Sequence, residues 1–91
     1  MSYKLVHTDS YIKRAKTFLT RQPQLLKQYE KTLQLLEINP FNSSLRLQSL
    51  QGRLEGLSSV SVNMSYQTML QLVIRDNDII LIDIGDHDQV Y

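Results

Sequence analysis

The sequence contains no cysteine, which excludes disulfide bonds and metal sites built from thiolates. Its two histidines, His7 and His87, are too few to predict a zinc site. No apolar run approaches the roughly 18 residues that a membrane-spanning helix needs. No signal peptide opens the chain either, so we expect a cytoplasmic protein that requires no metal and no other cofactor.

What is present is the composition of an ordinary soluble globular protein, with 42% hydrophobic and 21% charged residues. A chain of 91 residues is long enough for one domain with a single modest core. No internal repeat, low-complexity segment or linker divides it, so residues 1–91 are assigned to one domain.

Charge is distributed unevenly along the chain. Residues 1–53 carry nine Lys and Arg against three Asp and Glu, a balance of +6, whereas residues 54–91 carry one against six, a balance of −5. A basic half can attract nucleic acid, because Lys and Arg that neutralise phosphates supply most of the nonspecific affinity. The alternative is that these side chains cover solvated helix surfaces. The charges alone do not distinguish nucleic-acid binding from this alternative.

The first half of the chain begins with a predicted strand and helix. The strand covers residues 3–7, and the three residues after it, 8–10, are all favourable N-cap residues. Over residues 11–19 the apolar side chains recur at spacings of three and four, as on one side of a helix. Basic and polar residues fill the other side, and the helix is predicted to end near Thr20.

A second helix is predicted from Pro23 to about Ile38. Proline suits the first turn of a helix, where its missing N–H costs nothing, and apolar residues follow at helical spacing over residues 25–36. Asn39 ends the helix because the residue before a proline is disfavoured in the helical region. Neither helix can bury its apolar side alone, so the two require a sheet on which to pack.

The second half of the chain supplies that sheet. Residues 41–57 are irregular, and their leucines are expected to fix the segment to the core while two glycines permit tight bends. Strands are predicted at residues 59–62 and 66–74, with a turn at residues 75–78. The last strand, residues 79–84, is apolar on both faces and is therefore placed inside the sheet. The predicted fold class is α+β, ordered β-α-α-β-β-β, with a helical hairpin on a twisted, mainly antiparallel sheet.

The chain ends in its most informative segment, residues 84–91, with the sequence Ile-Gly-Asp-His-Asp-Gln-Val-Tyr. A buried strand that ends in a glycine turn, here at Gly85, is a rigid platform for polar side chains. His87 and Tyr91 follow it, in a position where catalytic groups would be expected. The alternative is that both side chains form an ordinary polar rim.

A family pattern is carried by three parts of the sequence: residues 50–57, residues 59–62 leading to Tyr66, and residues 84–91. Together they resemble the RelE/ParE superfamily of bacterial toxins, over essentially the whole chain. The His-Asp-x-Val-Tyr ending is the most specific part and is similar to the ribonuclease branch, particularly its YafQ-like members. The resemblance implies the toxin of a type II toxin–antitoxin module. Many such toxins cleave mRNA on the ribosome, whereas the ParE branch inhibits DNA gyrase.

The resemblance also implies a site that cleaves RNA through its own 2′-OH. Such a site needs a base, an acid and a cation beside the phosphate. His87 matches the family's C-terminal histidine, a general acid or base, and Tyr91 matches its terminal aromatic residue, which would stack on or orient RNA. Arg46, Arg53 and Gln67 are the candidate contacts to RNA phosphates.

The partners implied by the resemblance are mRNA, the ribosome and a cognate antitoxin. The excess positive charge of residues 1–53 would complement an acidic, partly disordered antitoxin segment.

Four positions depart from the family pattern. Gln67 stands where the ribonucleases carry an arginine, Ser59 and Ser61 where they carry lysines or a histidine, and Asp83 where they carry a basic residue. Each charge-assisted contact to phosphate is worth roughly 1.5–3 kcal/mol. Two alternatives therefore stay open within the superfamily: a toxin that acts by binding, as ParE does on gyrase, and a member whose catalytic residues have decayed. A third alternative lies outside the superfamily: an unrelated α+β interaction module whose C-terminal sequence resembles the family by coincidence.

Overall fold

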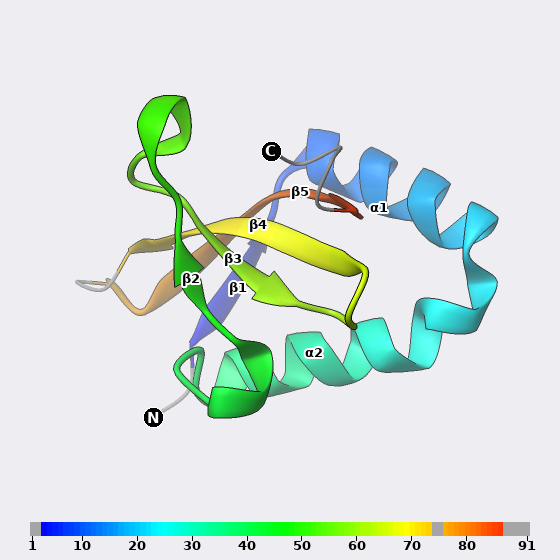
Figure 1. Cartoon of the computed structure of the whole chain (residues 1–91), viewed down its shortest axis with the longest axis horizontal. Coiled ribbons are helices and arrows are strands. Elements are labelled where there is room, and N and C mark those ends of the chain that lie inside the picture. The colour runs from blue at the N-terminus through cyan, green and yellow to red at the C-terminus, as the bar shows by residue number, and fades with distance from the viewer. Residues whose placement is uncertain (1–2, 74–75, 87–91) are drawn as a thin grey trace.

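A computed structural model of the protein describes residues 3–73 and 76–86. They form two helices packed against a five-stranded sheet (Figure 1). The elements in chain order are β1 (Lys4–His7), α1 (Asp9–Arg21), α2 (Leu26–Ile38), β2 (Gln48–Ser49), β3 (Ser58–Ser61), β4 (Tyr66–Val73) and β5 (Asp78–Asp86). This architecture confirms the predicted α+β fold class. Strand β2, two residues long within the segment predicted to be irregular, is the one strand that the sequence did not predict.

Both helices lie where the sequence predicts them. Thr8 caps α1, since its side-chain oxygen accepts a hydrogen bond of 3.2 Å from the backbone N–H of Tyr11. A 3-10 turn, η1 (Pro23–Leu25), leads directly into α2. Asn39, the residue before a proline, has left the helical region with φ −164° and ψ 104°. No helix in the described part of the chain is long and apolar enough to cross a membrane.

Strand β5 is the interior strand that the sequence predicts. The turn predicted at Gly85 is wrong, because β5 continues through Gly85 to Asp86 while pairing with β4. The strand order is β1-β5-β4-β3-β2, so β5 lies between β1 and β4. It pairs in parallel with β1 and antiparallel with β4, and the β4–β3 and β3–β2 pairs are also antiparallel. The sheet is therefore mainly antiparallel, as predicted, and only β1 makes it mixed.

A bulge interrupts β5 where it pairs with β4. Leu70 pairs with Leu81 but its neighbour Met69 pairs with Asp83, so β5 has one extra residue, Ile82, between the two pairs. A bulge changes the direction of the side chains around it. Here it leaves Asp83 on the face of its partner Met69, whereas the next residue, Ile84, faces the main core.

The main core lies between the helices and the sheet. A 2.8 Å hydrogen bond joins the hydroxyls of Tyr11 and Tyr29 inside it and ties α1 to α2. Burial raises the pKa of both tyrosines, because a phenolate is costly to hold away from water. The buried apolar residues of this core are Tyr11, Ala15, Tyr29, Leu36, Leu45, Val60, Val62, Leu70, Ile79, Leu81 and Ile84.

A smaller apolar cluster occupies the opposite face of the sheet. Leu50 and Met69 are buried there, and Leu54, Leu57 and Ile82 pack against them. Met69 points away from the main core because successive residues of a strand face opposite sides. The leucines of the irregular segment thus fix it to the protein as predicted, on this face rather than only in the main core.

Candidate functional site

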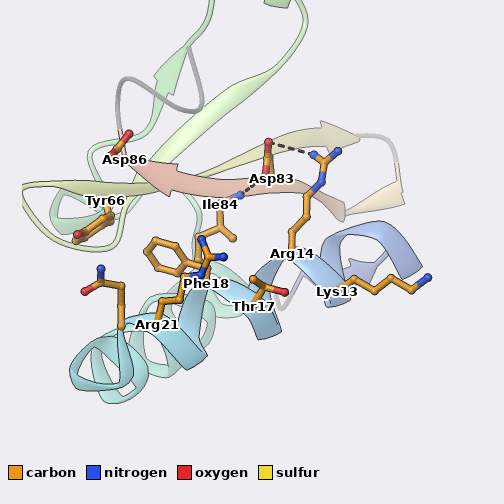
Figure 2. A pocket seen from close by; sticks show the side chains of 10 residues that line it. Lys13, Arg14, Thr17, Phe18, Arg21, Tyr66, Asp83, Ile84 and Asp86 are labelled. Carbon is orange, nitrogen blue, oxygen red and sulfur yellow. Dashed lines mark hydrogen bonds and ion pairs between the residues drawn. The ribbon is translucent and has the colours of Figure 1, made fainter.

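A cleft of about 490 Å³ opens between α1 and the end of β5 (Figure 2). Its volume is typical of pockets that bind small ligands. One side is cationic and comes from α1, and the other side carries carboxylates and comes from β5. The charged and aromatic side chains that line it are Lys13, Arg14, Phe18, Arg21, Tyr66, Asp83 and Asp86.

The spacing along α1 explains why one side of the helix lines the cleft. Arg14, Phe18 and Arg21 are separated by four and three residues, so they project from the same side of the helix. Tyr11 and Ala15, which are buried in the main core, follow a neighbouring line along the helix. The cleft therefore lies along the border between the buried and the exposed sides of α1.

Two contacts hold Asp83 at one end of the cleft. Arg14 Nη1 lies 3.1 Å from Asp83 Oδ2 in an ion pair, which Figure 2 shows reaching from α1 to β5. The backbone N–H of Ile84 donates a hydrogen bond of 2.8 Å to the other carboxylate oxygen, Oδ1. At this end of the cleft, the negative charge of Asp83 therefore largely balances the positive charge of Arg14.

An aromatic pair forms the other end. The rings of Phe18 and Tyr66 meet edge to face, with centroids 5.1 Å apart and planes inclined at 71°. Tyr66 is only partly buried, and Figure 2 shows it at the opposite end of the cleft from Lys13. Arg21 belongs to the same lining, and no carboxylate of the described residues forms an ion pair with it.

The two predicted catalytic residues, His87 and Tyr91, lie outside the described residues. The last described residue, Asp86, lines the cleft, and His87 is the next residue in the chain. The described lining contains no histidine. Its cations, carboxylates and aromatic rings are groups that can bind a ligand. Within residues 3–73 and 76–86, no three side chains of His, Cys, Asp or Glu lie together in a way that could hold a metal ion.

The three predicted phosphate contacts do not line this cleft. Arg46 lines a separate hollow of about 200 Å³ beside Gln28 of α2 and Asn63. Arg53 is exposed in the 3-10 turn η3 (Gly52–Leu54), which follows β2 in the chain, whereas Arg46 precedes β2. Gln67 is 3% exposed within β4. Neither of the two hollows is lined by more than one of these three side chains.

The register of the strands places the four positions that depart from the family pattern on one face of the sheet. Ser61 pairs directly with Gln67, and Ser59, two residues earlier in β3, is 2% exposed. Paired residues and residues two apart share a face, so these three lie on the face opposite the helices. Asp83 pairs with Met69, which also pairs with Ser59, so its register places it on that face as well, where Arg14 reaches it from α1.

The sequence alone did not single out the cations of α1 as site residues. Lys13 and Arg14 fall on the polar side of a predicted amphipathic helix, which is typical of a solvated surface. The available signal was the position of Phe18, an aromatic residue spaced at helical intervals between Arg14 and Arg21. Such a pattern predicts that cations border an apolar contact of the helix, but it does not show which strand packs against that side of the helix.

No established protein-family profile matches the sequence, and no curated protein sequence matches it. Solved structures do match. YafQ from E. coli strain BL21(DE3) is 14% identical with a TM-score of 0.80, over 98% of each chain. A chain of the E. coli DinJ–YafQ toxin–antitoxin complex is 17% identical with a TM-score of 0.78, over 100% of this chain and 99% of that one. The YoeB/ParE toxin from Agrobacterium tumefaciens is 15% identical with a TM-score of 0.74, over 92% of this chain and 98% of that one. At these identities the similarity shows the fold: the protein has the fold of the YafQ and YoeB/ParE toxins, as its resemblance to the RelE/ParE superfamily predicts.

Proposed function

We propose that the protein is the toxin of a type II toxin–antitoxin module and that it inhibits translation by cutting mRNA on the ribosome. The observation that carries this proposal is the match to YafQ over 98% of both chains. It is supported by the ending of the sequence, where His87 directly follows a cleft-lining residue. In this proposal His87 acts as general acid or base and Tyr91 stacks on or orients the RNA.

The residues beside His87 suit it to the role of general acid. Asp86 and Asp88 flank it in the sequence, and nearby carboxylates stabilise an imidazolium. The 2′-oxygen of the RNA bonds to the phosphorus as its proton passes to a base, and the bond from phosphorus to the 5′-oxygen breaks as the imidazolium donates its proton to that leaving oxygen. The same carboxylates repel the RNA phosphate, so the site needs cations from elsewhere. Arg46 and Arg53 are the contacts that the sequence proposes.

The proposed partner is a small antitoxin protein. DinJ–YafQ from E. coli and YoeB–YefM from Staphylococcus aureus, both similar in fold, are toxin–antitoxin complexes. An acidic, partly disordered segment would complement the +6 balance of residues 1–53. Co-expression with an adjacent small gene is expected to restore growth and to yield a complex that co-purifies. If neither happens, the proposed partnership is wrong.

A toxin that acts by binding alone is the second candidate, and one observation favours it. Ser59 and Gln67 are buried and Asp83 is paired with Arg14, so these family positions supply no phosphate-binding cation here. A protein of this kind would block its target without cutting RNA, as the ParE branch does with gyrase.

Expression in a bacterium, followed by mapping of the 5′ ends of mRNA, separates the two candidates. Growth arrest with cuts in phase with codons is expected for the ribonuclease. Growth arrest without new 5′ ends would assign the protein to the binding type. Normal growth at confirmed expression of the protein would contradict both.

Replacement of His87 provides the sharpest test of the chemistry. His87→Gln is expected to lower the rate of mRNA cleavage by roughly 10²–10⁴-fold, the usual contribution of general acid–base catalysis. The rate is measured with purified protein and translating ribosomes. His7→Gln is the matched control, because His7 is exposed on β1 and lines neither hollow. Full toxicity of His87→Gln would make His87 a polar rim residue and favour the binding type.

A further inference from the structure

We propose that the cleft between α1 and β5 binds one nucleotide of single-stranded RNA, with a phosphate on Arg21 and the base beside Tyr66. This rests on the proposed function for the choice of RNA as ligand. It adds a binding site on α1, outside the residues to which the family resemblance points.

Arg21 is the cation best placed to bind a phosphate. It lies exposed in the last turn of α1 and lines the aromatic end of the cleft. Arg14, by contrast, already faces the carboxylate of Asp83 at 3.1 Å. An arginine presents a planar set of N–H donors that matches two phosphate oxygens at once. A phosphate entering the cleft therefore meets the guanidinium of Arg21, with which no carboxylate of the described residues forms an ion pair.

Tyr66 provides a surface for the base. Its ring is fixed by the edge-to-face contact with Phe18 at 5.1 Å, and the residue is still partly exposed in the cleft. Proteins that bind single-stranded nucleic acid commonly combine cations along the backbone with aromatic rings on which bases stack. Arg21 and Tyr66 bring both kinds of group to one end of the cleft.

The carboxylates of β5 favour a nucleotide over an acidic protein segment. Asp83 and Asp86 line the side opposite the cations of α1. An acidic segment is negative along its length, so these carboxylates would repel it. A nucleotide is negative only at its phosphate, and the amino groups of its base can donate hydrogen bonds to carboxylate oxygens. The opposite charges of the two sides therefore match the two ends of a nucleotide.

The position of the cleft relates it to the proposed chemistry. Asp86 lines the cleft and precedes His87 in the chain. A nucleotide held by Arg21 and Tyr66 would therefore be a neighbour of the nucleotide that is cut, and it would fix the RNA in position beside the proposed catalytic histidine.

Fluorescence anisotropy with a labelled 2′-O-methyl RNA hexamer tests the proposal, because this probe has no 2′-OH and cannot be cut. Arg21→Gln is expected to weaken binding roughly tenfold or more, as for the loss of a charge-assisted contact. Lys16→Gln is the matched control: the charge change is the same, on the same helix, at an exposed residue that lines neither hollow. Its effect is expected to stay within about twofold.

A second pair of variants tests the base. Tyr66→Leu is expected to weaken binding roughly fivefold or more through the loss of stacking, whereas Tyr66→Phe keeps the ring and should bind like the wild type. Circular dichroism of each variant verifies that it is folded.

Equal binding by Arg21→Gln and the wild type would overturn the proposal, as would equal losses in Arg21→Gln and Lys16→Gln. Hexaglutamate is the competing probe. If it displaced the RNA and its own binding depended on Arg21, the cleft would be a site for an acidic protein segment instead.

The measurement is independent of cleavage. If the wild type cuts no mRNA but binds the hexamer through Arg21, the ribonuclease proposal fails and the nucleotide site stands. If mRNA is cut but Arg21→Gln binds the hexamer and cuts mRNA like the wild type, the nucleotide site is wrong and the ribonuclease stands.

Discussion

The two faces of the sheet differ in what they offer to a ligand. Under the helices, the end of the sheet opens into a cleft beside the exposed cations Arg14 and Arg21. On the opposite face, Leu50 and Met69 form a second apolar cluster, and Gln67 is buried. The family pattern leads one to expect positive charge on the strands. In this chain the cations beside the larger cleft come from a helix, and the strands contribute carboxylates and buried polar groups.

The first way to sharpen this comparison is to measure how much each face stabilises the fold. Leu81 is fully buried in the main core, and Leu81→Ala is expected to lower the free energy of unfolding by about 2–5 kcal/mol. Met69→Ala should cost less, toward about 2 kcal/mol, because its cluster is smaller and methionine is flexible. Urea denaturation measures both. An equal loss would mean that the two faces contribute alike.

The second way is to place a cation on the face of the sheet opposite the helices. Gln67→Arg introduces the arginine that the family pattern carries at this position, and is expected to lower the free energy of unfolding by roughly 1–3 kcal/mol, because Gln67 is 3% exposed. Gln71→Arg is the control, since Gln71 is exposed four residues further along the same strand. Thermal unfolding compares the two variants. A Gln67→Arg protein as stable as the wild type would show that this face accepts a cation after all.

The third prediction concerns Tyr11 and Tyr29, the hydrogen-bonded tyrosines that join α1 to α2 in the main core. The unfolded chain releases phenolic protons near the ordinary pKa of 10.0, whereas Tyr11 and Tyr29 hold theirs because burial raises the pKa of each. Stability is therefore complete below about pH 10 and falls above it, by up to about 1.4 kcal/mol per pH unit for each tyrosine. Urea denaturation between about pH 9 and about pH 11 measures the fall. A double variant, Tyr11→Phe with Tyr29→Phe, should show a flatter profile, and an equally steep fall would exclude the pair as its cause.

The smallest effect on stability is expected at the ion pair of the cleft. Arg14 is 58% and Asp83 25% exposed, so solvent screens the pair and limits its contribution to about 1 kcal/mol or less. Asp83→Asn should therefore leave the melting temperature nearly unchanged. A clear fall in the melting temperature would show that the pair contributes more than its exposure implies.

The order and type of the main elements could be predicted because their signals are local. Thr8 caps a helix by contacting a backbone group three residues away, and the residue before Pro40 ends a helix through a steric clash. The two residues of β2 and the bulge at Ile82 carry no such signal. Both arise from the register between strands, which packing of distant segments determines.

The site was harder to predict than the fold for the same physical reason. His87 and Tyr91 could be chosen from a pattern within a few consecutive residues, and they remain predictions. The cleft exists because Arg14 and Arg21 of the first helix lie opposite Asp83 of the last strand. Sequence spacing shows which residues share one side of a helix, but not which strand that side will meet.

The interior position of β5 has a consequence for the synthesis of the protein. Among the described strands β1 is made first and β5 last, yet the two are neighbours in the sheet. Until β5 leaves the ribosome, β1 has no partner strand and the cleft lacks one of its sides. Pairings between such distant segments also form slowly. A nascent chain therefore gains this fold only after β5 has been made, whatever the state of the elements that precede it.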